Sequence, residues 1–229
     1  MNTMTIFEKM EEISSEYDLV NSEKYNYYAD WLQQEANRAD FLHTQIHFRY
    51  AVENFGSVIA GVLSKMPTLT EERMSIAENV AEEHGHNNFS KTHKKTFITF
   101  LESMNENNVS LNLNKSLPAM KFNESVRNFI LTHSYYEGAA MVGIIEHLYI
   151  NMSALIAKTV NQRNWDEFCQ QSHYDVHAEL DAEHARELFE VSESMWNTGN
   201  IEIQKQIVDA AELGALYFVS LYNDILEEI

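Results

Sequence analysis

Three side chains that could bind one metal ion lie close together in the C-terminal third of the chain. His177, Asp181 and His184 are spaced i, i+4 and i+7. An α-helix turns by about 100° per residue, so these side chains fall within about 60° of one another on one face. Two imidazoles and a carboxylate suit a first-row metal such as iron or manganese, whereas structural zinc sites favour thiolates. The stretch therefore predicts a metal-binding helix face, with His173 one turn earlier in a supporting or surface position.

A second cluster of carboxylates and imidazoles precedes the middle of the chain. Glu82 and His93 are eleven positions apart and would share a face of an unbroken helix. Glu83 would lie about 80° away from His93, unless Gly85 kinks the helix and brings Glu83 round. His86 shares the His93 face and competes for its place. The sequence therefore predicts one carboxylate ligand, Glu82 or Glu83, and one imidazole ligand, His93 or His86.

A single carboxylate marks the third candidate helix. Glu146 shares a helix face with residues that are mostly small or apolar, such as Ala139 and Val142. A lone Glu on a buried face is costly unless it is paired or binds a metal. Together the predicted ligands are three carboxylates and three imidazoles, enough for two metal ions with open positions left over: Glu82 (or Glu83), His93, Glu146, His177, Asp181 and His184.

Helices must position these side chains, because long helix-period stretches dominate the sequence and strand-type alternation is rare. The 229 residues include only two prolines and seven glycines. Clear breaks occur at the Asn-rich stretch 105–114 and at 196–200. We predict one all-α domain over residues 1–229, a seven-helix bundle whose core houses ligands from three facing helices. The expected helices lie at about 5–15, 22–37, 39–65, 70–103, 121–160, 163–197 and 200–227.

The charge balance excludes some partners. The chain has 35 acidic and 16 basic residues and a formal net charge of −19, so nucleic acid and anionic membrane surfaces would be repelled. No run of 18 apolar residues is present and the N-terminus lacks a signal-peptide pattern, so neither a membrane span nor secretion is expected. The single cysteine, Cys169, allows no internal disulfide and fits a reducing cytosol. A cytoplasmic protein is therefore expected.

A polar stripe on the expected helix 39–65 is the candidate substrate pocket. His43, His47, Tyr50 and Asn54 follow i, i+4, i+7 and i+11 spacing and share one face. Such a face either points to solvent or lines a polar pocket beside the metals, and the sequence leaves both interpretations open. The pocket interpretation favours a small polar substrate over a long apolar one.

The ligand pattern resembles that of the haem-oxygenase-like di-metal oxidases and oxygenases. Members of this family are seven-helix proteins related in fold to thiaminase II and pyrroloquinoline-quinone synthase. They carry a Glu and a His on one core helix, a Glu on the next, and His-x3-Asp-x2-His on a third. The motif from His177 to His184 looks especially like that of the chlamydial member that associates with death domains. The resemblance covers about residues 40–190.

This resemblance implies two bound Fe(II) ions, with O2 as co-substrate and a peroxo-di-iron species as the oxidant; the ligand types alone would also suit Mn. It implies an enzyme that oxidises a small metabolite, an amino acid or derivative first of all, by N-oxygenation, desaturation or C–C cleavage. An external reductant and a homodimer are further expectations. Three alternatives stay open: a cofactor-free thiaminase-like or quinone-synthase-like enzyme, a fatty-acid oxidative decarboxylase, and a non-catalytic metal-binding or interaction protein.

Overall fold

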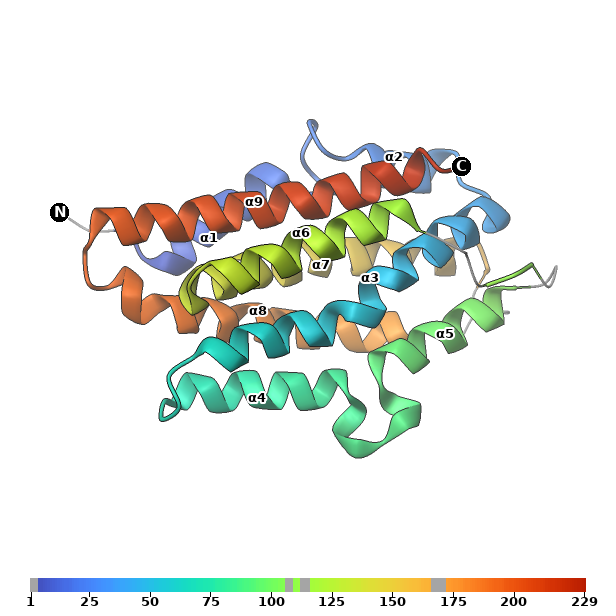
Figure 1. The fold of residues 1–229 in the computed structure, drawn as a ribbon. Helices are drawn as coiled ribbons and strands as arrows, with labels where there is room; N and C mark the ends of the chain where they lie inside the picture. Colours follow the sequence, from blue (N-terminus) through green and yellow to red (C-terminus); the bar gives the residue numbers. More distant parts are fainter. Residues whose placement is uncertain (1–3, 106–108, 112–115, 166–171) are drawn as a thin grey trace.

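The computed structural model describes residues 4–105, 109–111, 116–165 and 172–229, except the side chains of residues 172 and 175–180. Every regular element in these ranges is helical and none is a β-strand, so the predicted all-α fold is confirmed. The helices form an elongated bundle (Figure 1). The α-helices are α1 (Ile6–Tyr17), α2 (Tyr27–Gln34), α3 (Arg38–Lys65), α4 (Glu71–Glu83), α5 (His93–Met104), α6 (Leu117–Thr132), α7 (Tyr135–Gln162), α8 (Ser172–Trp196) and α9 (Ile201–Leu226).

Helix α7 forms the centre of the bundle. It packs most extensively against α8 and α9 and also contacts α1, α2, α3 and α6. Gly143 permits the close approach of α8, because a Cβ at this position would lie 2.7 Å from a ring carbon of Phe189. By length and composition α7 could cross a membrane, but 78% of its most apolar window is buried inside the protein, as expected for a core helix. Glu146, near the middle of α7, is consequently only 4% exposed.

The expected unbroken helix 70–103 is wrong. Helix α4 ends at Glu83, and the chain passes through two short 3₁₀ turns, η1 (Gly85–Asn87) and η2 (Phe89–Lys91), before α5 begins. Gly85 has φ +67°, and a Cβ there would lie 2.7 Å from the backbone of Lys91 and Thr92. Thr92 then caps α5 by accepting a hydrogen bond from the backbone N of Lys95 at 3.2 Å. The shared-face argument for Glu82 and His93 fails, because no continuous helix joins them.

The expected single helix 121–160 is also wrong, whereas the expected helices 39–65 and 200–227 correspond to α3 and α9. The chain turns between α6 and α7, where Ser134 and Glu137 form a capping box. Ser134 Oγ accepts from the Glu137 backbone N at 3.3 Å, and Glu137 Oε2 accepts from the Ser134 backbone N at 2.9 Å. This Ser-x-x-Glu signal is readable in the sequence. Because of these two breaks the described part of the chain has nine α-helices instead of seven.

Candidate metal centre

Three metal-binding side chains meet where α7 crosses α8. One donor atom each from Glu146 on α7 and from Asp181 and His184 on α8 lie within 4.8 Å of one another. All three residues are buried, with exposures of 4%, 1% and 2%. Within the described residues, Glu146 Oε1 and His184 Nδ1 have no hydrogen-bond partner. We call Glu146, Asp181 and His184 the α7–α8 half. Buried polar atoms without hydrogen-bond partners are costly, and a bound cation would remove this cost. The α7–α8 half therefore has the composition of a cation site.

Repulsion between neighbouring carboxylates in the α7–α8 half also favours binding of a cation. Burial raises the pKa of the Glu146 carboxyl well above its usual value, and the nearby charges of Asp181 and Glu83 raise it further. Carboxylates that share a dry site repel one another, and either a proton or a metal ion relieves that repulsion. A mixed set of carboxylates and an imidazole suits iron or manganese, so these residues fit the metal that the sequence predicts.

A second group of donors approaches from the end of α4 and the start of α5. His93 Nδ1 lies 2.7 Å from Glu83 Oε1, and both side chains are nearly buried. Burial lowers the pKa of His93, but the charges of Glu83, Asp181 and Glu82 outweigh burial and raise it overall. Glu82 Oε2 lies 2.6 Å from His184 Nε2, so this carboxylate reaches the α7–α8 half directly. We call Glu82, Glu83 and His93 the α4–α5 half.

The break at Gly85 determines which of the alternative ligands, Glu82 or Glu83 and His93 or His86, face the centre. Both glutamates reach the centre: Glu83 pairs with His93, and Glu82 pairs with His184. His86 has φ +47° and its side chain is 55% exposed, 3.7 Å from Glu78 and 3.8 Å from Glu82. This geometry makes His93, and not His86, the imidazole that faces the centre.

Two further histidines, His173 and His177, lie in the first half of α8. His177 lies on α8 one turn before Asp181, but its side chain is outside the described residues, so its ligand role stays a prediction. His173 is 2% exposed and lies 3.1 Å from Thr96 Oγ1, with its ring edge-on to Phe97. The helix spacing predicts a supporting or a surface position for His173, and its burial excludes the surface position.

An apolar cavity of about 50 Å³ adjoins these donors. Its lining includes the side chains of Glu83, His93, Glu146, Tyr149 and His173. A volume of this size holds a few water-sized molecules. The remaining wall comes from apolar side chains of α3, α6, α7 and α9, among them Phe48, Ala51, Val52, Phe55, Phe122 and Phe218. The cavity therefore presents the donors to a small or slender group in a largely apolar setting.

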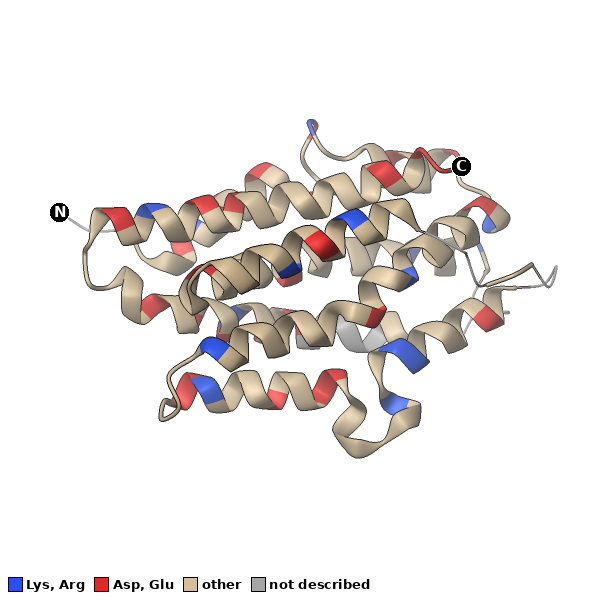
Figure 2. Ribbon diagram, viewed as in Figure 1, with Lys and Arg blue, Asp and Glu red and all other residues tan. Residues whose placement is uncertain are grey.

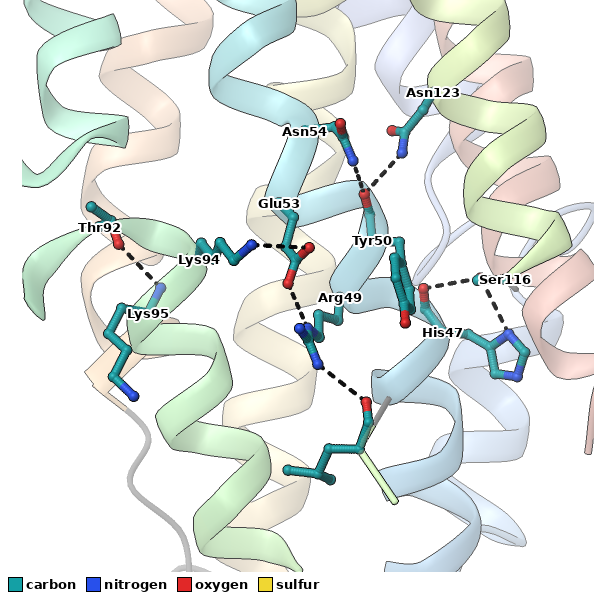
Figure 3. Close-up of polar contacts among 11 residues, drawn as sticks. His47, Arg49, Tyr50, Glu53, Asn54, Thr92, Lys94, Lys95, Ser116 and Asn123 are labelled. Carbon is teal, nitrogen blue, oxygen red and sulfur yellow. Dashed lines mark hydrogen bonds and ion pairs between the residues drawn. The ribbon is translucent and has the colours of Figure 1, made fainter. Parts of the chain in front are cut away.

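The polar stripe of α3 does not line this cavity. Asn54 Nδ2 and Asn123 Nδ2 each donate to the Tyr50 carbonyl oxygen at 2.8 Å, and His47 Nδ1 lies 3.2 Å from Ser116 Oγ (Figure 3). The ring of His43 packs at 5.0 Å from that of His47. Of the α3 residues that line the cavity, Phe48, Ala51 and Phe55 each follow a stripe residue by one position, about 100° round the helix, and Val52 lies further round. A substrate pocket at this stripe stays a prediction that the cavity does not support.

A buried hydrogen-bonded network that the sequence did not predict extends from the cavity. Tyr174 Oη donates to Gln45 Oε1 at 2.5 Å, and Gln45 Nε2 donates to Tyr28 Oη at 3.0 Å. Tyr28 Oη lies 2.7 Å from Thr44 Oγ1. Tyr149 hydrogen-bonds to Tyr174, and burial raises the pKa of Tyr149 well above its usual value, so its phenol stays neutral. The network holds Tyr149 at the cavity wall, and it joins residues too far apart in sequence for any spacing to reveal.

Comparison with known proteins agrees with the predicted resemblance. Residues 42–217 match a haem-oxygenase-like family described as iron-containing redox enzymes. The fold is similar to that of a TenA homologue from Pyrococcus furiosus, with a TM-score of 0.67 at 11% identity over 96% of this chain and 97% of that one. It is also similar to a TenA homologue from Pseudomonas syringae (TM-score 0.66, 12% identity, 97% and 91% covered). A CADD-like protein of unknown function from Nostoc punctiforme gives a TM-score of 0.56 at 13% identity, with 96% and 98% covered. A search of curated proteins found no match.

Proposed function

Because the chain belongs to a haem-oxygenase-like family of iron-containing redox enzymes, we propose that it is a non-haem di-iron oxidoreductase that uses O2 to oxidise a small organic substrate. The observation that carries this proposal is the α7–α8 half. Its three buried donors converge to within 4.8 Å, and two of their polar atoms have no partner among the described residues. Without a bound metal ion, such a cluster would destabilise the fold, because no other interaction would compensate for burying its polar atoms.

The donors divide between two ions. Glu146, Asp181 and His184 would hold one iron, and Glu83 and His93 would contribute to the second, with Glu82 available to either. His177, whose side chain lies outside the described residues, is the further ligand that the sequence motif predicts. When bound, iron supplies the electrons and the open coordination positions that O2 activation needs. Metal binding competes with the proton that Glu146 retains at its raised pKa, so loading should release protons.

The chain's own residues confine the reaction. The aromatic wall formed by Phe48, Phe55, Phe122 and Phe218 keeps bulk water from the donors. Tyr149 is fixed by its hydrogen bond to Tyr174 and presents a neutral phenol to the cavity. These features favour substrates whose reacting part is apolar. An external reductant and a homodimeric assembly complete the proposal.

The TenA-like fold supports one competing function, a cofactor-free reaction like that of thiaminase II on the same helices. Glu146 Oε1 and His184 Nδ1, which have no partner in the part of the chain that the structure describes, favour the metal-dependent function, because a cofactor-free site would be expected to satisfy them within the protein. A fatty-acid oxidative decarboxylase is a variant of the main proposal, and a metal-binding protein without catalysis is the remaining alternative.

Anaerobic titration with Fe(II), followed by rapid mixing with O2, separates these functions. We expect saturation near two irons per chain and a transient visible absorption whose decay one class of substrate accelerates. Absence of iron uptake would favour the cofactor-free reaction. Iron uptake without any reaction with O2 would indicate a binding role.

A further inference from the structure

One face of α6 is exposed along its whole length. The side chains on it are spaced alternately by three and four residues, which places them in one line on a helix: Leu117, Met120, Glu124, Arg127 and Leu131. We call these five residues the α6 face. Its apolar members Leu117, Met120 and Leu131 are 58%, 38% and 62% exposed. This alternating spacing is typical of a helix that packs against another helix.

A surface groove adjoins the α6 face. It lies between α3 and α6 and has a volume of about 540 Å³. Most of the α6 face lines it on one side and α3 on the other, among them Met120, Glu124, Arg127 and Leu131 from α6 and Val58 and Gly61 from α3. The α6 face is therefore one wall of a hollow that can receive side chains of a second helix.

The charges of the α6 face balance, unlike those of the whole chain. Glu124 and Arg127 have opposite signs, and within the described part of the chain neither side chain forms an ion pair or a hydrogen bond. The third charged residue of α6, Lys121, already pairs with Asp224 at 2.7 Å. Figure 2 shows both signs of charge along α6. Two copies of a chain with net charge −19 repel each other, so a face without net charge is where their approach costs least.

A second copy of α6 in antiparallel orientation matches this face member by member. When a twofold axis passes beside positions 125 and 126, Glu124 lies opposite the partner's Arg127, and Met120 lies opposite the partner's Leu131. The same two contacts then occur twice, once on each side of the axis. A parallel pair would place Glu124 against Glu124 and Arg127 against Arg127, and like charges repel each other. The order of the charges therefore selects the antiparallel arrangement.

We propose that the α6 face is the interface between two copies of this chain, which pair antiparallel about a twofold axis. Two equivalent ion pairs between Glu124 and Arg127 lie at its centre, and contacts between Met120 and Leu131 lie on either side. Burial of the apolar side chains supplies affinity, and the ion pairs fix the orientation. The inference rests on the proposed function only for the homodimeric assembly, to which it adds the surface and the register, and it is independent of the iron chemistry.

Sedimentation velocity measurements on the full chain, over a range of concentrations, test the proposal. We expect the wild type to be a dimer. Arg127→Glu and Glu124→Arg each place like charges opposite one another at both ion pairs, so each should weaken the dimer at least about tenfold. The double variant Glu124→Arg/Arg127→Glu restores opposite charges and should dimerise as the wild type does. Leu131→Asp should also weaken the dimer, because it places a charge beside the partner's Met120.

Lys24→Glu is the matched control, because it changes the net charge by as much as Arg127→Glu at an exposed position between α1 and α2. It should leave the dimer unchanged. A monomeric wild type would overturn the proposal and leave the α6 face to a different partner. Single charge reversals without effect, or a double variant that stays monomeric, would also overturn it. Iron titration of the same samples separates the two claims: a dimer that takes up no iron defeats the proposed iron chemistry alone, and iron uptake by a monomeric wild type defeats this inference alone.

Discussion

The two halves of the metal centre are built in different ways. Helices α7 and α8 run without a break past the three donors of the α7–α8 half, whereas the α4–α5 half straddles two 3₁₀ turns. In the α7–α8 half, Glu146 Oε1 and His184 Nδ1 have no partner among the described residues, although the other ring nitrogen of His184 contacts Glu82 at 2.6 Å. In the α4–α5 half, Glu83 and His93 already form an ion pair at 2.7 Å.

This difference predicts which half of the metal centre binds a metal ion first. A donor without a partner gains a full interaction when a cation arrives, whereas a paired donor must first give up its existing contact. We therefore expect the α7–α8 half to hold the tighter ion and the α4–α5 half to hold the weaker one.

The largest effect should follow from removing a donor of the α7–α8 half. Asp181→Ala should lower the affinity for iron by more than about 100-fold, beyond the loss typical of residues that only orient ligands. Glu146→Gln should do the same and also raise the unfolding temperature of the metal-free protein, because the neutral amide removes the cost of protonating a buried carboxyl whose pKa is raised. Anaerobic iron titration and thermal unfolding measure the two effects.

Glu183→Gln is the matched control, because Glu183 lies on the same helix two positions from Asp181 and its side chain is 61% exposed. It should leave both iron binding and the unfolding temperature unchanged. If Asp181→Ala and Glu146→Gln both bound nearly two irons per chain with unchanged affinity, the proposed di-metal site would be wrong.

A smaller effect is expected in the α4–α5 half, where two neighbouring carboxylates differ in burial. Glu83 is 8% exposed, pairs with His93 and lines the cavity, whereas the side chain of Glu82 is 26% exposed. Glu83→Gln should therefore weaken the second iron by about 10-fold to 100-fold, and Glu82→Gln by less. Iron titration of the two variants in parallel gives the order. A larger loss in Glu82→Gln would reverse the assignment, and small, equal losses would remove both residues from the ligand set.

The contrast between the halves also explains what the sequence could predict. Periodicity is reliable along a continuous helix, so the spacing of Asp181 and His184 placed them correctly on one face. Glu146 followed from the cost of a lone buried carboxylate. Across the break after Glu83 periodicity has no meaning, because residues with positive φ such as His86 and Asn87 redirect the chain. Gly85 was recognisable as a break point, but the direction of the turn depends on tertiary contacts.

The pH dependence of stability should differ between the metal-free and the iron-loaded protein. The pKa of His93 is raised above its ordinary 6.5, and the pKa of Glu146 is raised well above its ordinary 4.5. A folded-state pKa above the unfolded one adds stability that is complete below the unfolded pKa and is lost as pH rises through the folded pKa. Metal-free stability should therefore fall as pH rises above about 4.5, by up to about 1.4 kcal/mol per pH unit for each proton.

Denaturant unfolding at pH 5.5 and pH 7.5, with chelator and with Fe(II), measures this difference. Iron-loaded protein should show the opposite trend, because the ligands must lose their protons to bind metal. Glu146→Gln should flatten the metal-free profile. A metal-free stability that rises over this interval would contradict the pKa directions on which the comparison rests.

The smallest effects should follow from changes in the polar stripe of α3, whose residues do not line the cavity. Asn54→Ala removes an exposed side chain whose amide bonds only to the backbone of its own helix, so the unfolding free energy should change by less than about 0.5 kcal/mol. His47→Ala loses the contact with Ser116 and should cost about 1 kcal/mol. Neither variant should alter iron stoichiometry, because neither side chain lines the cavity beside the proposed iron donors. If Asn54→Ala or His47→Ala lost iron, the polar stripe would contribute to the metal centre, and the division between a polar face and an apolar, cavity-lining face of α3 would have to be reversed.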